Sequence, residues 1–97
     1  MAEVNRLDWH ISPFRADRFL DTWEPAAAKM PAYGAKSWSL TRGVDDPLAF
    51  QQTSVWEQRS DFERYWFSPE IEHAREQIIG FYDIPLIPSW HTLVLAE

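Results

Sequence analysis

Apolar and polar residues alternate near the start of the chain. Leu7, Trp9 and Ile11 are separated by polar residues, and this period of two predicts a strand with one buried face. Ser12 and Pro13 come next, in the order of a helix N-cap and a proline at the first helical position. A helix is therefore expected to begin at this point.

The helix that follows is predicted to be amphipathic. Phe19, Leu20 and Trp23 recur at helical spacing between charged residues, which indicates about four turns with one apolar face. Pro25 lacks the N–H that an inner helical position donates, so a kink or a break is expected there. Gly34 is a residue type that ends helices, and the helical region is expected to stop at it.

The middle of the chain has the pattern of a β-hairpin. Over residues 35–42 the large apolar side chains Trp38 and Leu40 alternate with small polar ones. Residues 43–47 are rich in glycine, aspartate and proline and predict a turn. Residues 50–57 then form a third strand, antiparallel to the second.

The last third predicts helix and then strand. A second helix is expected to begin within residues 58–61, and Ser68 with Pro69 resembles a fresh cap for a second helical segment that ends at Gly80. Residues 90–96 are expected to form the final strand. The order strand, helix, strand, strand, helix, strand is the split βαβ pattern of a ferredoxin-like α+β fold. We expect one domain over residues 1–97, with a four-stranded antiparallel sheet and helices on one face.

Both faces of this sheet are expected to carry bulky apolar residues. In the third strand Phe50 and Trp56 share one face while Val55 lies on the other, and in the last strand Trp90 lies opposite Leu93. Because the helices cover only one face, the other needs a partner, and a face-to-face homodimer would supply one. The alternative is a second face that is amphipathic and stays in contact with water.

Composition narrows the range of functions. The chain has 97 residues, a net charge of −6 and no cysteine, which argues against a nucleic-acid or membrane partner and excludes disulfides and thiolate metal sites. No apolar run approaches the roughly 20 residues of a membrane helix, and the N-terminus lacks a signal sequence. A cytoplasmic location is the expectation. The unusual feature is aromatic content, with 6 Trp, 6 Phe and 3 Tyr.

Three segments resemble the antibiotic-biosynthesis-monooxygenase-like superfamily of dimeric α+β barrels. They are Gly-Ala-Lys-Ser-Trp-Ser-Leu-Thr-Arg at 34–42, Asp-Asp-Pro at 45–47 and Val-Trp-Glu-Gln-Arg-Ser-Asp-Phe at 55–62. The resemblance covers nearly the whole chain. It implies the fold and the homodimer, and it leaves the reaction open because the superfamily includes oxygenases, haem-degrading enzymes, isomerases, cyclases and members with no known activity.

The quinol- and anthrone-oxidising branch of that superfamily suggests candidate residues. Its strand-end tryptophan corresponds to Trp56 and its helix arginine to Arg75, whereas its asparagine position holds Gln52 and its tyrosine position holds Phe62. Enzymes of this branch use no metal or flavin, because the substrate carbanion itself reacts with oxygen while the protein stabilises the oxyanion. The alternative is that Trp56 belongs to the core and Arg75 is a surface residue.

The haem-degrading branch fits less well. Its bulky helix residue corresponds to Tyr65 and its axial histidine to Arg75, so no haem ligand is expected there. His73 is two residues away, which turns its direction by about 200° on a helix. No histidine pair has metal-ligand spacing, so the expectation is a protein without metal or other cofactor.

Two functions remain open at this stage. The first is a cofactor-independent monooxygenase acting on a planar aromatic, quinol- or anthrone-like molecule, and the alternative is a non-catalytic small-molecule-binding or accessory dimer. The tryptophans are either core or walls of a slot for a planar ligand. A lone histidine such as His10 is either a general base near a pocket or a structural residue. The candidate catalytic residues are Arg75, Gln52 and His10, and the candidate ligand-binding residues are Trp56, Trp38, Phe62 and Tyr65.

Overall fold

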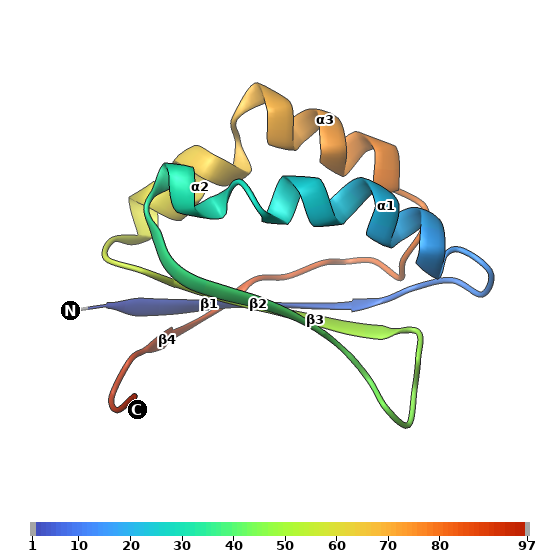
Figure 1. Ribbon diagram of the computed structural model, residues 1–97, viewed down its shortest axis with the longest axis horizontal. Coiled ribbons are helices and arrows are strands. Elements are labelled where there is room, and N and C mark those ends of the chain that lie inside the picture. Colours follow the sequence, from blue (N-terminus) through green and yellow to red (C-terminus); the bar gives the residue numbers. More distant parts are fainter. Residues whose placement is uncertain (1, 97) are drawn as a thin grey trace.

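The structure, a computed structural model, describes residues 2–96 and contains one four-stranded sheet with all helices on one side of it (Figure 1). The elements in chain order are β1 (Glu3–His10), α1 (Ala16–Ala27), the 3-10 helix η1 (Met30–Tyr33), β2 (Ala35–Arg42), β3 (Ala49–Trp56), α2 (Arg59–Trp66), α3 (Pro69–Ile78) and β4 (Ser89–Thr92). The strand order is β2-β3-β1-β4 and every pairing is antiparallel. This confirms the ferredoxin-like α+β prediction.

Several element boundaries agree with the sequence pattern. β2 occupies residues 35–42 as predicted, and Ser68 with Pro69 begins a separate helical segment, α3. Register shifts between Ala35 and Ser37, where β2 carries a bulge against β3. Gly34, at φ 114°, adopts the left-handed conformation that ends η1.

The start of α1 differs from the prediction. The helix begins at Ala16 instead of Pro13, because Phe14 adopts a positive φ of 69° that no α-helix can include. The N–H of Arg15 donates to the carbonyl of Ser12 at 3.1 Å, so Ser12 closes a turn before the helix. The expected break at Pro25 is also absent, since α1 continues past it to Ala27. Pro25 is exposed on the helix, where water can replace the missing partner of the freed carbonyl.

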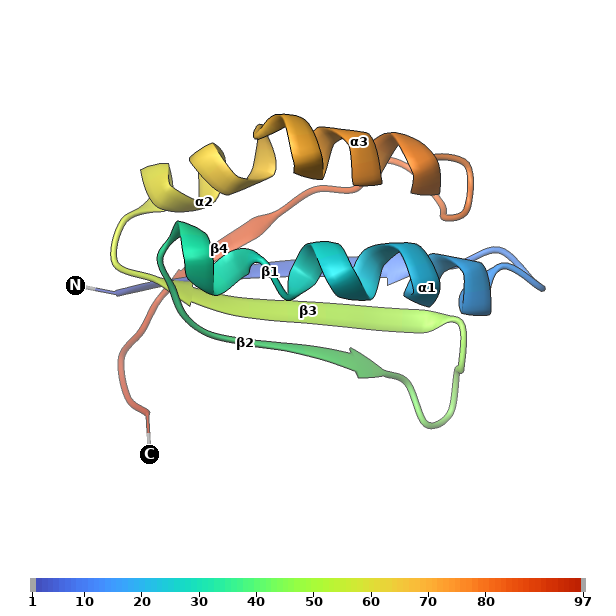
Figure 2. The same ribbon diagram turned by 45° about the horizontal axis from the view of Figure 1, so that its top comes forward.

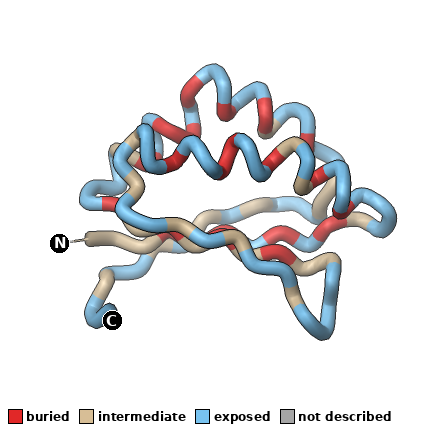
Figure 3. The backbone as a smooth tube through the Cα atoms, in the orientation of Figure 1, coloured by how far each residue is buried: buried red, intermediate tan, exposed pale blue. Residues whose placement is uncertain are grey.

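Buried residues occur in both the sheet and the helices (Figure 3), and the core lies between these two layers. The largest fully buried side chains are aromatic. Trp9, Trp23 and Trp56 are at most 2% exposed. The ring of Trp23 makes edge contacts with Trp9 at 5.5 Å and with Trp66 at 5.8 Å between centroids. Such contacts add to the burial of large apolar surfaces, so this layer provides much of the stability.

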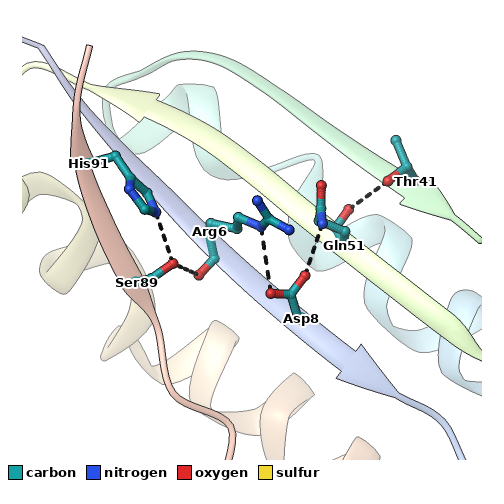
Figure 4. Close-up of polar contacts among 6 residues, drawn as sticks. All are labelled: Arg6, Asp8, Thr41, Gln51, Ser89 and His91. Carbon is teal, nitrogen blue, oxygen red and sulfur yellow. Dashed lines mark hydrogen bonds and ion pairs between the residues drawn. The ribbon is translucent and has the colours of Figure 1, made fainter. Parts of the chain in front are cut away.

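The opposite face of the sheet is polar, which corrects the expectation of two apolar faces. Register places the following residues together on this open face: Val4, Arg6, Asp8, His10, Ser37, Ser39, Thr41, Ala49, Gln51, Thr53, Val55, Ser89 and His91. Asp8 accepts a hydrogen bond from the Gln51 amide at 3.1 Å and lies 3.6 Å from Arg6 (Figure 4). Strand alternation did put Val55 opposite Trp56, but on that face only Val4 beside it is apolar, and its neighbours Ser37 and Thr53 carry hydroxyls.

The final strand is also shorter than predicted. β4 ends at Thr92, so Leu93 and Val94 are not on the strand and do not define its two faces as expected. The N–H of Leu93 still donates to the carbonyl of Ala2 at 3.1 Å. Beyond it Val94 and Leu95 are 90% and 82% exposed, which leaves two apolar side chains beside the sheet edge.

Two buried side chains of the core, Asn5 and Trp9, carry polar atoms without a hydrogen-bond partner among the described residues. Asn5, on the helix side of β1, is 0% exposed, and neither its amide nitrogen nor its amide oxygen forms a hydrogen bond within residues 2–96. A buried amide without partners costs about 1–3 kcal/mol, whereas an apolar side chain of similar shape does not carry that cost. We expect Asn5→Leu to raise the free energy of unfolding by about 1 kcal/mol, measured by urea denaturation. Gln51→Leu on the open face is the matched control and should give no increase.

Candidate functional site

A hollow with a volume of about 910 Å³ lies between α1 and β2. Its lining comes from one flank of the helix and from the edge strand: Leu20, Asp21, Glu24, Pro25, Ala28, Trp38, Ser39, Leu40, Thr41, Arg42 and Phe50. We call it the α1–β2 groove. It is an open groove and not an enclosed chamber within the core.

The groove exists because the helices cover the inner strands more completely than β2. Trp38 pairs with Ser54 and Leu40 pairs with Gln52, so each pair shares the helix-facing side of the sheet. Ser54 and Gln52 are 0% exposed, while Trp38 and Leu40 are only half-buried. Figure 2 shows β2 at the edge of the sheet beside α1. The strand edge therefore presents a tryptophan and a leucine to a space that no helix fills.

The predicted ligand-binding residue Trp38 lines this groove, whereas the predicted catalytic residue Gln52 is buried in the core. The indole N–H of Trp23 donates to the Gln52 amide oxygen at 2.8 Å, and the Gln52 amide nitrogen is 3.7 Å from the sulfur of Met30. Both ends of the Gln52 side chain are thus engaged within the protein.

The structure brings three other predicted residues together in the core. Trp56, Phe62 and Tyr65 contact one another with ring centroids 5.6–6.1 Å apart, and all are at most 3% exposed. The Trp56 indole N–H donates to the Ser54 hydroxyl at 2.7 Å, and the Tyr65 hydroxyl donates to the Ala26 carbonyl at 2.8 Å. Burial raises the pKa of Tyr65 well above its usual value, so the phenol stays protonated. None of the three lines the α1–β2 groove.

Two tryptophan rings, Trp66 and Trp23, separate Arg75 from Gln52. Its guanidinium stacks on the Trp66 ring at 4.3 Å and donates to the Trp66 carbonyl at 3.1 Å. Trp66 contacts Trp23, which in turn donates to Gln52. Arg75 lines a separate hollow of about 280 Å³ together with Tyr82. Arg75 and Gln52 are therefore connected only through the two tryptophan rings, and they do not line a common groove.

His10 is separated from all these residues. It lies on the open face at the end of β1, where its Nε2 is 2.8 Å from Asp46 and its Nδ1 is 3.5 Å from Asp83. The Leu48 backbone N–H and the hydrogen bond with His10 hold the pKa of Asp46 below its usual value. His10 and Asp8 line a third hollow, of about 390 Å³, on this face.

Comparisons with known proteins identify the fold. No family model matches the sequence, and no curated protein matches it either. Among solved structures, one described as an antibiotic biosynthesis monooxygenase has a TM-score of 0.85 at 16% identity, with 98% of this chain and 100% of that chain covered. The chain has the antibiotic biosynthesis monooxygenase-like fold.

Two further structures with this monooxygenase-like fold match over nearly the whole chain. An asparagine-to-alanine mutant of SnoaB from Streptomyces nogalater, a cofactor-independent oxygenase, has a TM-score of 0.82 at 14% identity and 98% and 95% coverage. Rv0793 from Mycobacterium tuberculosis has a TM-score of 0.85 at 12% identity and 99% and 98% coverage. At these identities the similarity establishes the architecture and leaves the reaction open.

The part of the chain that the structure describes contains neither a membrane-spanning helix nor a cluster of metal-ligating side chains. No helix within residues 2–96 combines the length and apolar character needed to cross a bilayer. In the same part of the chain, no three histidine or acidic side chains converge as a metal site would require.

The sequence did not lead us to predict that residues of α1 line the groove. Asp21, Glu24 and Pro25 lie on one side of α1, Ala28 follows as its C-terminal cap, and all four line the groove. The signal was present, because two acids and two small residues share a helix flank next to the buried Trp23. Small side chains at Pro25 and Ala28 leave room that larger ones would have closed.

Proposed function

We propose that the protein binds a planar aromatic small molecule in the α1–β2 groove. The observation that carries this proposal is the groove itself, with about 910 Å³ of space over Trp38, Leu40 and Phe50. Small-molecule sites have volumes of about 300–1,000 Å³ and mostly apolar walls. The half-exposed indole of Trp38 offers a flat surface for stacking. This corresponds to the binding-module alternative of the sequence analysis, with Trp38 as the ligand contact.

A titration with a neutral tricyclic probe, anthracenemethanol, tests this proposal. We expect saturable binding followed by fluorescence, and Trp38→Ala should weaken it about tenfold, because a stacking contact contributes about 1–1.5 kcal/mol. Trp90→Ala is the matched control, since Trp90 is also half-buried but packs against Phe62 away from the groove. Equal loss in both variants, or no binding by the wild type, would contradict the proposal.

A second candidate function is cofactor-independent oxygenation of a quinol- or anthrone-like substrate. The similarity to SnoaB favours it. In such a reaction a ring CH₂ loses a proton, the carbanion transfers electrons to O₂, and C=O and water are formed. Gln52 and Arg75 are the proposed oxyanion contacts, and each must first leave its present partner, the Trp23 indole or the Trp66 carbonyl. His10 lies outside the groove.

Oxygen uptake separates the two candidates. With anthrone as substrate, an oxygenase should consume oxygen stoichiometrically with product, and Arg75→Ala should slow it at unchanged fold. A binding protein should leave the rate at the level of the uncatalysed reaction even where anthrone binds in the groove.

We also propose that a second copy of the chain covers the open face. The face has one arginine, one aspartate and two histidines, and its other side chains are uncharged hydroxyls, an amide and the small apolar Val4, Ala49 and Val55, although the net charge of the whole chain is −6. Two such faces can meet without strong repulsion and exchange hydrogen bonds, and Val94 and Leu95 beside the edge of β4 would gain cover. An interface on the order of 2,000 Å² in total is the size expected for an obligate pair.

A further inference from the structure

The acidic side chains that line the α1–β2 groove lack ion-pair partners, whereas the basic side chain of the lining is hydrogen-bonded. Asp21 and Glu24 lie one helical turn apart on α1, both exposed, and neither forms an ion pair with a basic group among residues 2–96. Arg42 is the basic residue of the lining, and its Nε donates to the Pro47 carbonyl at 2.6 Å. Its guanidinium also lies 5.1 Å above the Phe50 ring. Two carboxylates are therefore free to act on a ligand, while the guanidinium is held against the protein.

The aromatic side chain of Trp38, which lines the groove, also favours a positively charged ligand. An aromatic face carries the negative part of its quadrupole, so a cation near the Trp38 ring is attracted to it. Asp21 and Glu24 are exposed, so their attraction for a cation is strongest at low salt. An anion in the same place would be repelled by both carboxylates.

We propose that the groove selects a planar aromatic molecule that carries a protonated amine. This inference rests on the proposed binding function and adds the charge of its ligand. The ring system lies on Trp38 and Leu40, and the ammonium group points to the carboxylates of Asp21 and Glu24. The positively charged candidate Arg75 does not oppose this charge selection, because it lines another hollow.

Two fluorescent probes with three fused rings provide the test. Aminomethylanthracene carries an ammonium group near neutral pH, and anthracene carboxylate is an anion of similar size. We expect the dissociation constant of the cation to be at least tenfold lower at low salt. The ratio should fall as sodium chloride is added, because the carboxylates are exposed and are screened.

The double variant Asp21→Asn with Glu24→Gln identifies the source of the preference. It should weaken aminomethylanthracene binding about tenfold and strengthen anthracene carboxylate binding. The matched control is Asp17→Asn with Glu63→Gln, which removes two charges from exposed positions outside the groove. In the control variant, the logarithm of the ratio between the dissociation constants of the anion and the cation should stay at half or more of its wild-type value. An equal change in both double variants would show that the net charge of the chain, and not the groove, selects the ligand, and would overturn the inference.

The neutral probe distinguishes failure of this inference from failure of the binding function. If anthracenemethanol binds in a Trp38-dependent manner while cation and anion bind equally, the selection of an amine is wrong and the binding function stands. If none of the three probes binds, both proposals are wrong. Tighter binding of the anion than of the cation would overturn the inference directly.

Discussion

Trp23→Ala is expected to lower the free energy of unfolding by about 5 kcal/mol, at the upper end of the range for buried tryptophans. Trp23 is 0% exposed and lies between Trp9 and Trp66, so its removal leaves a cavity that α1 cannot close without losing other contacts. It also leaves the buried oxygen of Gln52 without its donor. Urea denaturation followed by circular dichroism measures the loss, and a cost below about 2 kcal/mol would contradict this account of the core.

A double-mutant cycle separates the cavity from the hydrogen bond. Trp23→Phe keeps an aromatic ring but cannot donate to Gln52, so the unpaired amide should add about 1–3 kcal/mol to its cost. Gln52→Leu, of similar volume, removes the group that needs the donor. The double variant should therefore be more stable than Trp23→Phe alone by about 1 kcal/mol. Strictly additive costs would show that the Trp23–Gln52 bond contributes nothing measurable.

Thr53→Lys is expected to raise the dissociation constant of the proposed dimer about a hundredfold. Thr53 lies near the centre of the open face, with Arg6 on one side in β1 and Ser39 on the other in β2. A lysine there adds a like charge next to Arg6 and sets two copies of itself against each other across the interface. Such contacts cost several kcal/mol. Sedimentation velocity at micromolar concentration should show wild-type dimer and variant monomer.

Gln77→Lys is the matched control for that measurement. It adds the same charge at an exposed position of α3, on the helix side of the molecule, and should leave the dimer intact. Loss of the dimer in both variants would indicate a general charge effect. A wild type that is monomeric throughout the range, or a Thr53→Lys protein that dimerises normally, would show that the open face is not the interface.

The local patterns predicted the fold well where a single element determined them. Alternation over residues 35–42 and the Ser68–Pro69 cap depend on nearest neighbours, and both appear in the structure. The start of α1 did not agree with its local sequence pattern. Phe14, in the connection between β1 and α1, has a positive φ that the pattern did not indicate. The polarity of the open face was misjudged because a few apolar residues were weighed without their cross-strand neighbours. Register, which supplies those neighbours, is a tertiary property.

The candidate site was less predictable for a related reason. The residue types of Trp56, Phe62 and Tyr65 suit a ligand slot and a packed core equally well, and their placement in the core depends on α2 packing over β3. Gln52 looked available because its partner Trp23 is 29 positions away along the chain. Trp38 could be singled out because it sits on an alternating strand. The exposure that makes it useful follows from the position of β2 at the edge of the sheet, which sequence alone did not reveal.

That edge position also bears on how the protein avoids uncontrolled association. An eight-residue edge strand offers unpaired backbone groups to any other strand, which is the usual beginning of sheet-to-sheet aggregation. β2 carries a bulge at Ala35–Ser37 near one end, where Lys36 pairs with Glu57, and a charged Arg42 at the other. A bulge twists the edge away from a flat partner, and buried charge would oppose a second strand there. β2 can thus form one side of a groove that is open to a small molecule. Its bulge and its charged residues oppose pairing with the edge strand of another molecule.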